Sequence, residues 1–170
     1  RDRLNELAFY FPLRKISAGR LSRVFRNTGE SDPVPGFSID LQHLDFSPVR
    51  GYMKGFVDMV FQFDGRFYLV DWKSNFLGNS VEDYGGPALA RAMKENYYVL
   101  QYHIYALALH QYLRLRLPDY RYDRHFGGVF YIFLRGVRTD RGPDYGIFRD
   151  RPSEKRITDL CHALINGPVQ

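Results

Sequence analysis

Apolar and polar residues alternate on both sides of the dipeptide Asp64-Gly65, over residues 49–63 and 66–73. Such alternation is typical of β-strands. Asp-Gly between two such runs favours a two-residue type I′ turn, because both turn positions need a positive φ. We therefore predict a β-hairpin whose register is set by this turn. The second arm is apolar on both faces, which is typical of a central strand.

Three other stretches have the period of a helix, residues 18–26, 88–117 and 153–166. Ser17 precedes the first as a candidate N-cap, and Pro87 stands at the start of the second. An unbroken helix over 88–117 would be about 45 Å long at 1.5 Å per residue, which is too long for so small a domain. We therefore expect a bend at 95–98.

Further strands are predicted at 6–13, 125–135 and 145–148, and residues 37–44 are either an extended piece or only a connection. The order of elements is strand, helix, hairpin, long helix, strand, helix. This order indicates an α/β fold with a mixed sheet and helices on its faces. At 170 residues, the chain 1–170 is expected to be a single domain with its own core.

The hairpin register places Asp58 opposite Asp71 in a close, non-hydrogen-bonded pair, with Lys73 diagonal to Asp58 on the same face. Two facing carboxylates destabilise a sheet unless they are neutralised. Three outcomes satisfy this requirement: a raised pKa, an ion pair with Lys73, or a bound cation. Oxygen ligands without cysteine favour a hard cation such as Mg²⁺, to which the backbone carbonyl of Trp72 can also point.

Gln101 and Tyr105 lie one helical turn apart and can fix Lys73 or a phosphate. A carboxylate pair, a hard cation and a lysine together favour hydrolysis of a phosphate ester. The alternative is a structural network of ion pairs that binds no ligand.

Composition adds little to this picture. The net charge of +5 and the 27 Tyr and Phe residues (13 and 14) suit a nucleic-acid partner, but they also suit a solvated surface. The same two interpretations hold for four basic residues of the long helical stretch, Arg91, Lys94, Arg114 and Arg116. The single cysteine excludes an internal disulfide and fits a reducing compartment. No apolar run is long enough for a membrane span, and no signal peptide is recognisable.

Three motifs, GFVD (55–58), VDWKS (70–74) and QYHIY (101–105), resemble the RecB-family nucleases of the PD-(D/E)xK superfamily. The likeness extends over nearly the whole chain and is stronger still to the C-terminal nuclease domain of the RecB subunits of bacterial exodeoxyribonuclease V. It implies a restriction-endonuclease-like fold. It also implies metal carboxylates at Asp58 and Asp71 and a catalytic lysine at Lys73. Trp72 stands where the family usually has Tyr.

The resemblance further implies one Mg²⁺ per site and a Mg²⁺-dependent exodeoxyribonuclease in the bacterial cytoplasm. Its parent would be a helicase–nuclease that processes double-stranded DNA ends and single strands for recombinational repair, with RecC-like and RecD-like partners and no membrane. The family also has a metal-binding histidine before its first strand. This chain is expected to begin too late to contain it, and His43 is expected to be a surface or loop histidine. We therefore expect weak metal binding and weak cleavage.

Two other functional classes of protein also fit the sequence. One is a non-catalytic module on the same fold that docks DNA or a partner. The other is a sequence-specific endonuclease, for which the chain offers no obvious base-reading element.

Overall fold

The computed structural model describes residues 3–14, 16–26, 29–44 and 51–165. Five strands form one sheet in the order β1-β2-β3-β4-β5. They are β1 (Arg3–Leu13), β2 (Gly51–Phe63), β3 (Arg66–Lys73), β4 (Phe126–Phe133) and β5 (Ile147–Asp150). Strands β3 and β4 are parallel and the other neighbours are antiparallel. The predicted mixed sheet is confirmed, with β3 at its centre.

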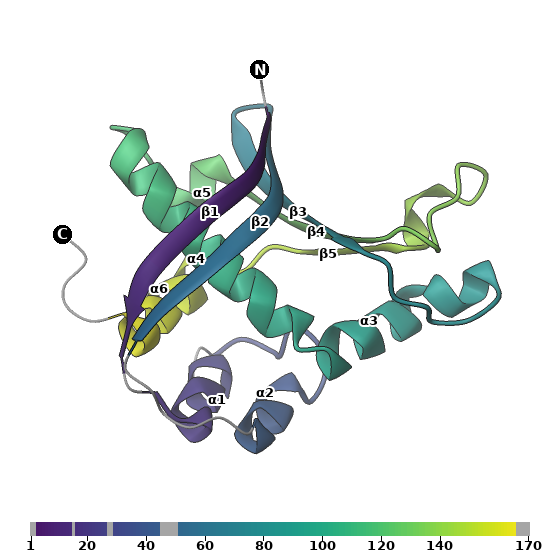
Figure 1. Cartoon of the computed structure of the whole chain (residues 1–170), viewed down its shortest axis with the longest axis horizontal. Coiled ribbons are helices and arrows are strands. Elements are labelled where there is room, and N and C mark those ends of the chain that lie inside the picture. The colour runs from purple at the N-terminus through teal and green to yellow at the C-terminus, as the bar shows by residue number, and fades with distance from the viewer. Residues whose placement is uncertain (1–2, 15, 27–28, 45–50, 166–170) are drawn as a thin grey trace.

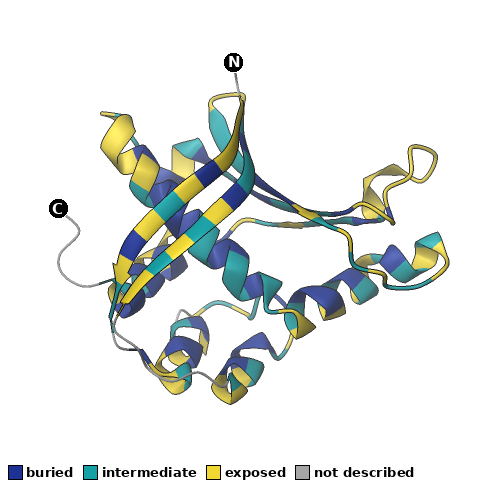
Figure 2. Ribbon diagram, viewed as in Figure 1, coloured by how far each residue is buried: buried dark blue, intermediate teal, exposed yellow. Residues whose placement is uncertain are grey.

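Helices pack against this sheet (Figure 1). They are α1 (Ala18–Arg26), α2 (Phe37–Asp40), α3 (Gly86–Glu95), α4 (Tyr98–Arg116), α5 (Tyr122–His125) and α6 (Glu154–Leu164), with 3-10 turns η1 (Leu41–His43), η2 (Val81–Tyr84) and η3 (Gly142–Asp144). Helix α4 crosses the sheet and contributes the largest share of the core, as the dark blue bands in Figure 2 show. The architecture is α/β and consistent with a restriction-endonuclease-like fold.

The hairpin has the register that the sequence predicts. Phe63 faces Arg66 across a turn in which Asp64 and Gly65 have φ of 48° and 72°. The paired ladder ends at Met59 and Val70. The level of Asp58 and Asp71 is therefore the first beyond the paired part of the hairpin.

The long helical stretch breaks where expected. Helix α3 ends at Glu95, and Tyr97 has a left-handed backbone (φ 54°) before α4 begins. Asn96 helps to close α3, because its side-chain amide donates to the carbonyl of Ala92 at 2.9 Å. The break lets α4 start in a new direction, three residues before Gln101.

The interpretation of residues 37–44 as extended or a mere connection is wrong, because they form α2 and η1. Phe37 and Leu41 are both fully buried and lie four residues apart, which is helical spacing. Asp32 stabilises the start of α2, since its Oδ2 accepts from the N–H and the hydroxyl of Ser38 at 3.2 and 3.0 Å.

Other boundaries differ by a few residues. β1 begins at Arg3. The strand predicted over 125–135 is shortened at its start by α5. The Tyr122 hydroxyl holds α5 in place by donating to the carbonyl of Pro152 at 2.8 Å. β5 covers 147–150 rather than 145–148. The predicted end of the last helix at 166 lies outside the described residues, within which α6 ends at Leu164.

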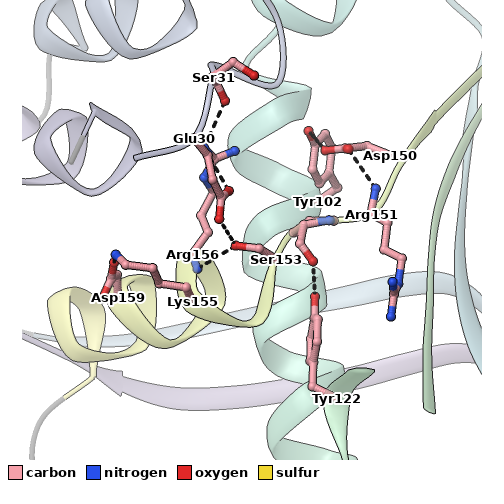
Figure 3. A network of polar contacts seen from close by, with 11 residues as sticks. Glu30, Ser31, Tyr102, Tyr122, Asp150, Arg151, Ser153, Lys155, Arg156 and Asp159 are labelled. Carbon is pink, nitrogen blue, oxygen red and sulfur yellow. Dashed lines mark hydrogen bonds and ion pairs between the residues drawn. The ribbon is translucent and has the colours of Figure 1, made fainter. Parts of the chain in front are cut away.

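A buried polar network ties α6 to the loop after α1 (Figure 3). Arg156, 4% exposed, pairs with Glu30 at 3.2 Å and donates to the carbonyl of Ser31 at 3.0 Å. The hydroxyl of Ser153 caps α6 by accepting the N–H of Arg156 at 3.1 Å. The network adds polar contacts to the apolar packing of α1 and α6, whose buried residues include Phe25 and Leu160.

Candidate active site

Asp58 reaches across the end of the hairpin to the backbone of β3. Its Oδ2 accepts the N–H of Trp72 at 2.9 Å. In the hairpin register, residue 72 is at a hydrogen-bonding position toward β2, so its N–H and its C=O both point to that side. By this register the Trp72 carbonyl is expected on the β2 side, and the residue as a whole is 44% exposed.

Asp71 and Lys73 form a close ion pair beside Asp58. The Nζ of Lys73 lies 2.7 Å from Oδ2 of Asp71, and both side chains are largely buried, 12% and 6% exposed. Within the described residues, that oxygen has this ionic contact but no well-directed hydrogen bond. Of the three predicted ways to neutralise the carboxylate pair, the ion pair with Lys73 is present in the structure.

The surroundings of Asp71 disfavour its charged form. Burial is the main reason that its pKa is raised above 3.8; the nearby charge of Asp58 adds to the rise and Lys73 opposes it. The second predicted outcome, a raised pKa, therefore holds together with the ion pair. Because burial removes water from the Asp71 carboxylate, a further cation bound nearby would stabilise its charged form.

Gln101 of α4 orients the lysine. Its Oε1 accepts from Nζ of Lys73 at 2.9 Å, and its Nε2 donates to the hydroxyl of Tyr105 at 2.9 Å. Burial, with a further contribution from the charge of Asp71, raises the pKa of Tyr105 to about 12. The structure thus brings Gln101 and Tyr105 to Lys73, as their helical spacing indicates.

Two tyrosines that sequence reasoning missed complete the surroundings of Lys73. The hydroxyl of Tyr131, from β4, donates to the same Oε1 of Gln101 at 2.9 Å. The ring of Tyr98, at the start of α4, lies under the ammonium, with Nζ 3.8 Å from the ring centroid. Burial is the main reason that the pKa of Tyr131 is raised well above its ordinary value, so its hydroxyl stays a donor.

A third carboxylate stands at the level of Asp58 on the neighbouring strand. Between the pairs Asn5–Met59 and Leu7–Val57, Glu6 occupies the β1 position opposite Asp58, with a left-handed backbone (φ 55°). Glu6 and Asp58 line one surface hollow together with Trp72. The only signal in the sequence was an acidic residue opening an otherwise apolar strand.

The candidate ligands are of the type that a hard cation prefers, but they are too few to form a complete site. Asp58, Asp71 and the Trp72 carbonyl offer oxygen, the ligand that Mg²⁺ prefers. Asp71 is buried, with a raised pKa and a lysine as its cationic neighbour. Among the described residues, however, no three His, Cys, Asp or Glu side chains are grouped so that they could hold an ion.

Among the described residues, no histidine joins the carboxylates as a metal ligand. His103 is fully buried in α4, its Nδ1 lies 2.7 Å from the carbonyl of Val99, and burial lowers its pKa to about 3. The Nδ1 of His110 lies 3.1 Å from the Tyr120 hydroxyl. His43 is exposed in η1, as expected.

The four basic residues of the long helical stretch are not one patch. Lys94 pairs with Asp40 at 3.2 Å, a structural contact between α3 and α2. Arg114 and Arg116 stand at the far end of α4, with Arg116 beside the ring of Tyr112. They are roughly 20–23 Å from Gln101 along the helix axis at 1.5 Å per residue.

The fold and this carboxylate–lysine arrangement define a chain of the restriction-endonuclease-like α/β class, and comparison with known proteins makes this more specific. It is 45% identical over 154 residues to the RecBCD enzyme subunit RecB of Escherichia coli, covering 90% of the chain. It is 41% identical over 160 residues (94% of the chain) to the RecB subunit of Haemophilus influenzae, and 36% over its whole length to that of Mycobacterium tuberculosis. The chain is a homologue of RecB.

The relationship concerns one segment of those relatives, because the chain spans 12% to 17% of their length. No family model matches the chain. None of the helices in the described residues is long and apolar enough to cross a lipid bilayer.

Proposed function

We propose that this chain is a Mg²⁺-dependent deoxyribonuclease that hydrolyses phosphodiester bonds. The observation that carries the proposal is the buried contact between Asp71 and Lys73 at 2.7 Å, at the open end of a hairpin that also presents Asp58 and the Trp72 carbonyl. Burying a carboxylate and an ammonium costs free energy that apolar residues would avoid. Such a pair in a RecB homologue is best explained by chemistry rather than by stability.

Asp58, Asp71 and the Trp72 carbonyl would hold the metal in this proposal. When bound, Mg²⁺ supplies positive charge that shields the phosphate and lowers the pKa of a water molecule. The chain leaves room for further ligands from water and substrate, which Mg²⁺ usually retains. Metal binding would also remove the electrostatic cost of keeping Asp58 and Asp71 close together.

Lys73 acts on the phosphate side of the reaction. Its ammonium is held by Gln101 at 2.9 Å and lies over the Tyr98 ring, so these two contacts would hold Lys73 in place if the Asp71 carboxylate bound a metal. A fixed positive charge stabilises the charge that develops on a phosphate in the transition state. Gln101 and Tyr105 then serve to position the lysine.

The larger setting that we propose follows from the relatives. They are named as RecB subunits of RecBCD enzymes. We propose that this chain forms part of a helicase–nuclease that processes double-stranded DNA ends for recombinational repair and works with RecC-like and RecD-like subunits. Its substrates would be duplex ends and single strands.

A cleavage assay on linear DNA tests the proposal. We expect Mg²⁺-dependent degradation that EDTA stops and that Asp71→Ala or Lys73→Ala lowers by at least about a hundredfold, the usual cost of losing a group that stabilises transition-state charge. The matched control is Lys155→Ala, which removes an exposed lysine paired with Asp159 on α6. Cleavage that survives in both site variants would overturn the assignment of these residues.

A second candidate is a non-catalytic module that docks DNA or a partner on the same fold. It is favoured by the lack of a three-ligand group among the described residues. DNA binding without cleavage, in Mg²⁺ and in Mn²⁺, would support the docking module over the nuclease.

A further inference from the structure

The segment that follows Lys73 is held firmly on one side by β4 and its exit. The carbonyl of Lys73 accepts the N–H of Leu134 at 2.9 Å, and the carbonyl of Ser74 accepts Nε of Arg135 at 3.0 Å. Arg135 is therefore fixed against the first residue after the lysine. Its remaining guanidinium nitrogens stay at the surface, where the residue is exposed.

Two tyrosines hold the same segment on its other side. The hydroxyl of Tyr84 accepts the N–H of Leu77 at 3.2 Å and donates to the carbonyl of Asn75 at 3.4 Å. The hydroxyl of Tyr98 donates to the side-chain oxygen of Asn75 at 3.1 Å. Because the ring of Tyr98 also lies under Lys73, the segment and the lysine share one support.

This segment forms one wall of a surface hollow between two projecting arms. One arm contains η2 (Val81–Tyr84), and the other is the segment 134–146. Figure 1 shows both arms extending beyond the end of the sheet, at the right. Phe76, Asn79, Ser80, Arg135 and Arg138 line the hollow. The arms are packed closely together, since a Cβ on Gly136 would lie 2.4 Å from that of Tyr84.

The hollow combines an aromatic ring with two guanidinium groups. Phe76 is 63% exposed although its backbone is fixed on both sides. Within the described residues, Arg135 and Arg138 form no ion pair with an acidic side chain, while Glu82 is paired with Arg141 at 3.7 Å. The nearby carboxylate of Asp83 is occupied, because its Oδ2 accepts from the N–H and hydroxyl of Ser80 at 2.9 and 3.1 Å.

We propose that this hollow binds single-stranded DNA beside the cleavage site, with a backbone phosphate on Arg135 and Arg138 and an unpaired base stacked on Phe76. Phe76 is three residues from Lys73, at most about 11 Å along an extended chain, so it serves a nucleotide close to the scissile phosphate. This inference rests on the proposed nuclease function and adds a subsite to it. A single strand is favoured because a base must leave its stack to cover an exposed ring.

The test is the affinity of the 170-residue chain for a fluorescein-labelled oligothymidylate, measured by fluorescence anisotropy in EDTA so that no metal-dependent cleavage occurs. Arg135→Gln with Arg138→Gln should weaken binding and reduce the steepness of its salt dependence by about 0.7, the value for one phosphate contact on a single strand. Phe76→Ala should weaken binding about fivefold or more and leave the salt dependence unchanged.

Matched controls carry the same chemical losses elsewhere on the surface. Phe63→Ala removes the ring of a residue that is 69% exposed at the hairpin turn, and Arg20→Gln with Arg23→Gln removes two exposed arginines of α1. Both should bind like the unsubstituted chain, and thermal unfolding of Phe76→Ala and of both controls should be unchanged. The double arginine variant loses the hydrogen bond from Arg135 to Ser74 and should unfold at a temperature lower by no more than about 4 °C.

The inference is overturned if the unsubstituted chain does not bind the oligonucleotide, if the hollow variants and the controls weaken binding equally, or if duplex DNA binds as well as the single strand and Phe76→Ala has no effect. Because binding is read in EDTA, this outcome is separate from the cleavage assay. The chain can fail one test and pass the other.

Discussion

Asp58 accepts the backbone N–H of Trp72 at 2.9 Å at the point where the β2–β3 ladder ends. In a continued ladder, the backbone of β2 would take that N–H. The side chain of Asp58 replaces it, which leaves the strands free to part around two carboxylates. One hydrogen bond therefore both ends the hairpin pairing and fixes the Asp58 carboxylate, which we propose as a metal ligand.

Substitutions of Asp58 separate these two roles. Asp58→Asn keeps an acceptor for the Trp72 N–H, whereas Asp58→Ala removes it. We expect the alanine variant to be less stable than the asparagine variant by about 1 kcal/mol, the usual net value of one hydrogen bond. Urea unfolding in EDTA measures the difference.

Cleavage should respond differently from stability, because both Asp58 variants lose the charge proposed to hold the metal. We expect both to lose Mg²⁺-dependent cleavage to a similar extent. An asparagine variant that cuts DNA as well as the unsubstituted chain would show that the Asp58 carboxylate is only a structural acceptor.

Tyr131 is predicted to position Lys73 through Gln101. Tyr131→Phe removes the hydroxyl that donates to Oε1 of Gln101 and leaves the ring in the core. We expect kcat to fall about two- to tenfold, the equivalent of one net hydrogen bond, with KM for DNA unchanged. Tyr68→Phe, on the adjacent strand and with its ring stacked on Phe61, is the control. An equal loss in both variants, or a change in KM alone, would argue against a positioning role.

The raised pKa of Asp71 predicts how stability depends on pH in the absence of metal. A carboxyl whose pKa is higher in the folded than in the unfolded chain binds its proton more tightly when folded. Its contribution to stability is therefore present below the unfolded value, near 3.8, and is lost as the pH rises through the raised value.

Asp71→Asn removes this cost. In EDTA, we expect its melting temperature relative to the unsubstituted chain to rise with pH through that window, by up to a few degrees, since about 1 kcal/mol corresponds to 2–4 °C in a domain of this size. Thermal unfolding from pH 4 to pH 8 checks this. A difference that does not vary with pH, or one that favours the unsubstituted chain at neutral pH, would mean that the Lys73 ion pair outweighs burial.

Much of the site could be derived from the sequence because its parts lie on regular elements. The Asp64-Gly65 turn fixes the hairpin register, and the register alone places Asp58 and Asp71 at one level. Helical spacing alone puts Gln101 beside Tyr105. These relationships are local in the chain, so no tertiary information was needed.

The parts that were missed depend on contacts between distant segments. Tyr131 lies in a strand so apolar that nothing distinguishes it from core residues, until α4 brings Gln101 within 2.9 Å. Glu6 reaches the level of Asp58 only through pairing of β1 with β2. Gly55 in the GFVD motif packs under the ring of Phe9, whose Cζ would lie 2.4 Å from an added Cβ, and this contact too depends on the pairing of β1 with β2.

The most direct test of the central claim is a calorimetric titration of the chain with Mg²⁺. We predict a saturable heat for one ion per chain that is lost in Asp71→Asn and in Asp58→Asn and is kept in Trp72→Phe, which retains the backbone carbonyl. Affinity is expected to be weak, since Asp58 and Asp71 are the only carboxylates assigned to the ion. Equal Mg²⁺ binding by the unsubstituted chain and both asparagine variants would contradict a metal site at this carboxylate pair.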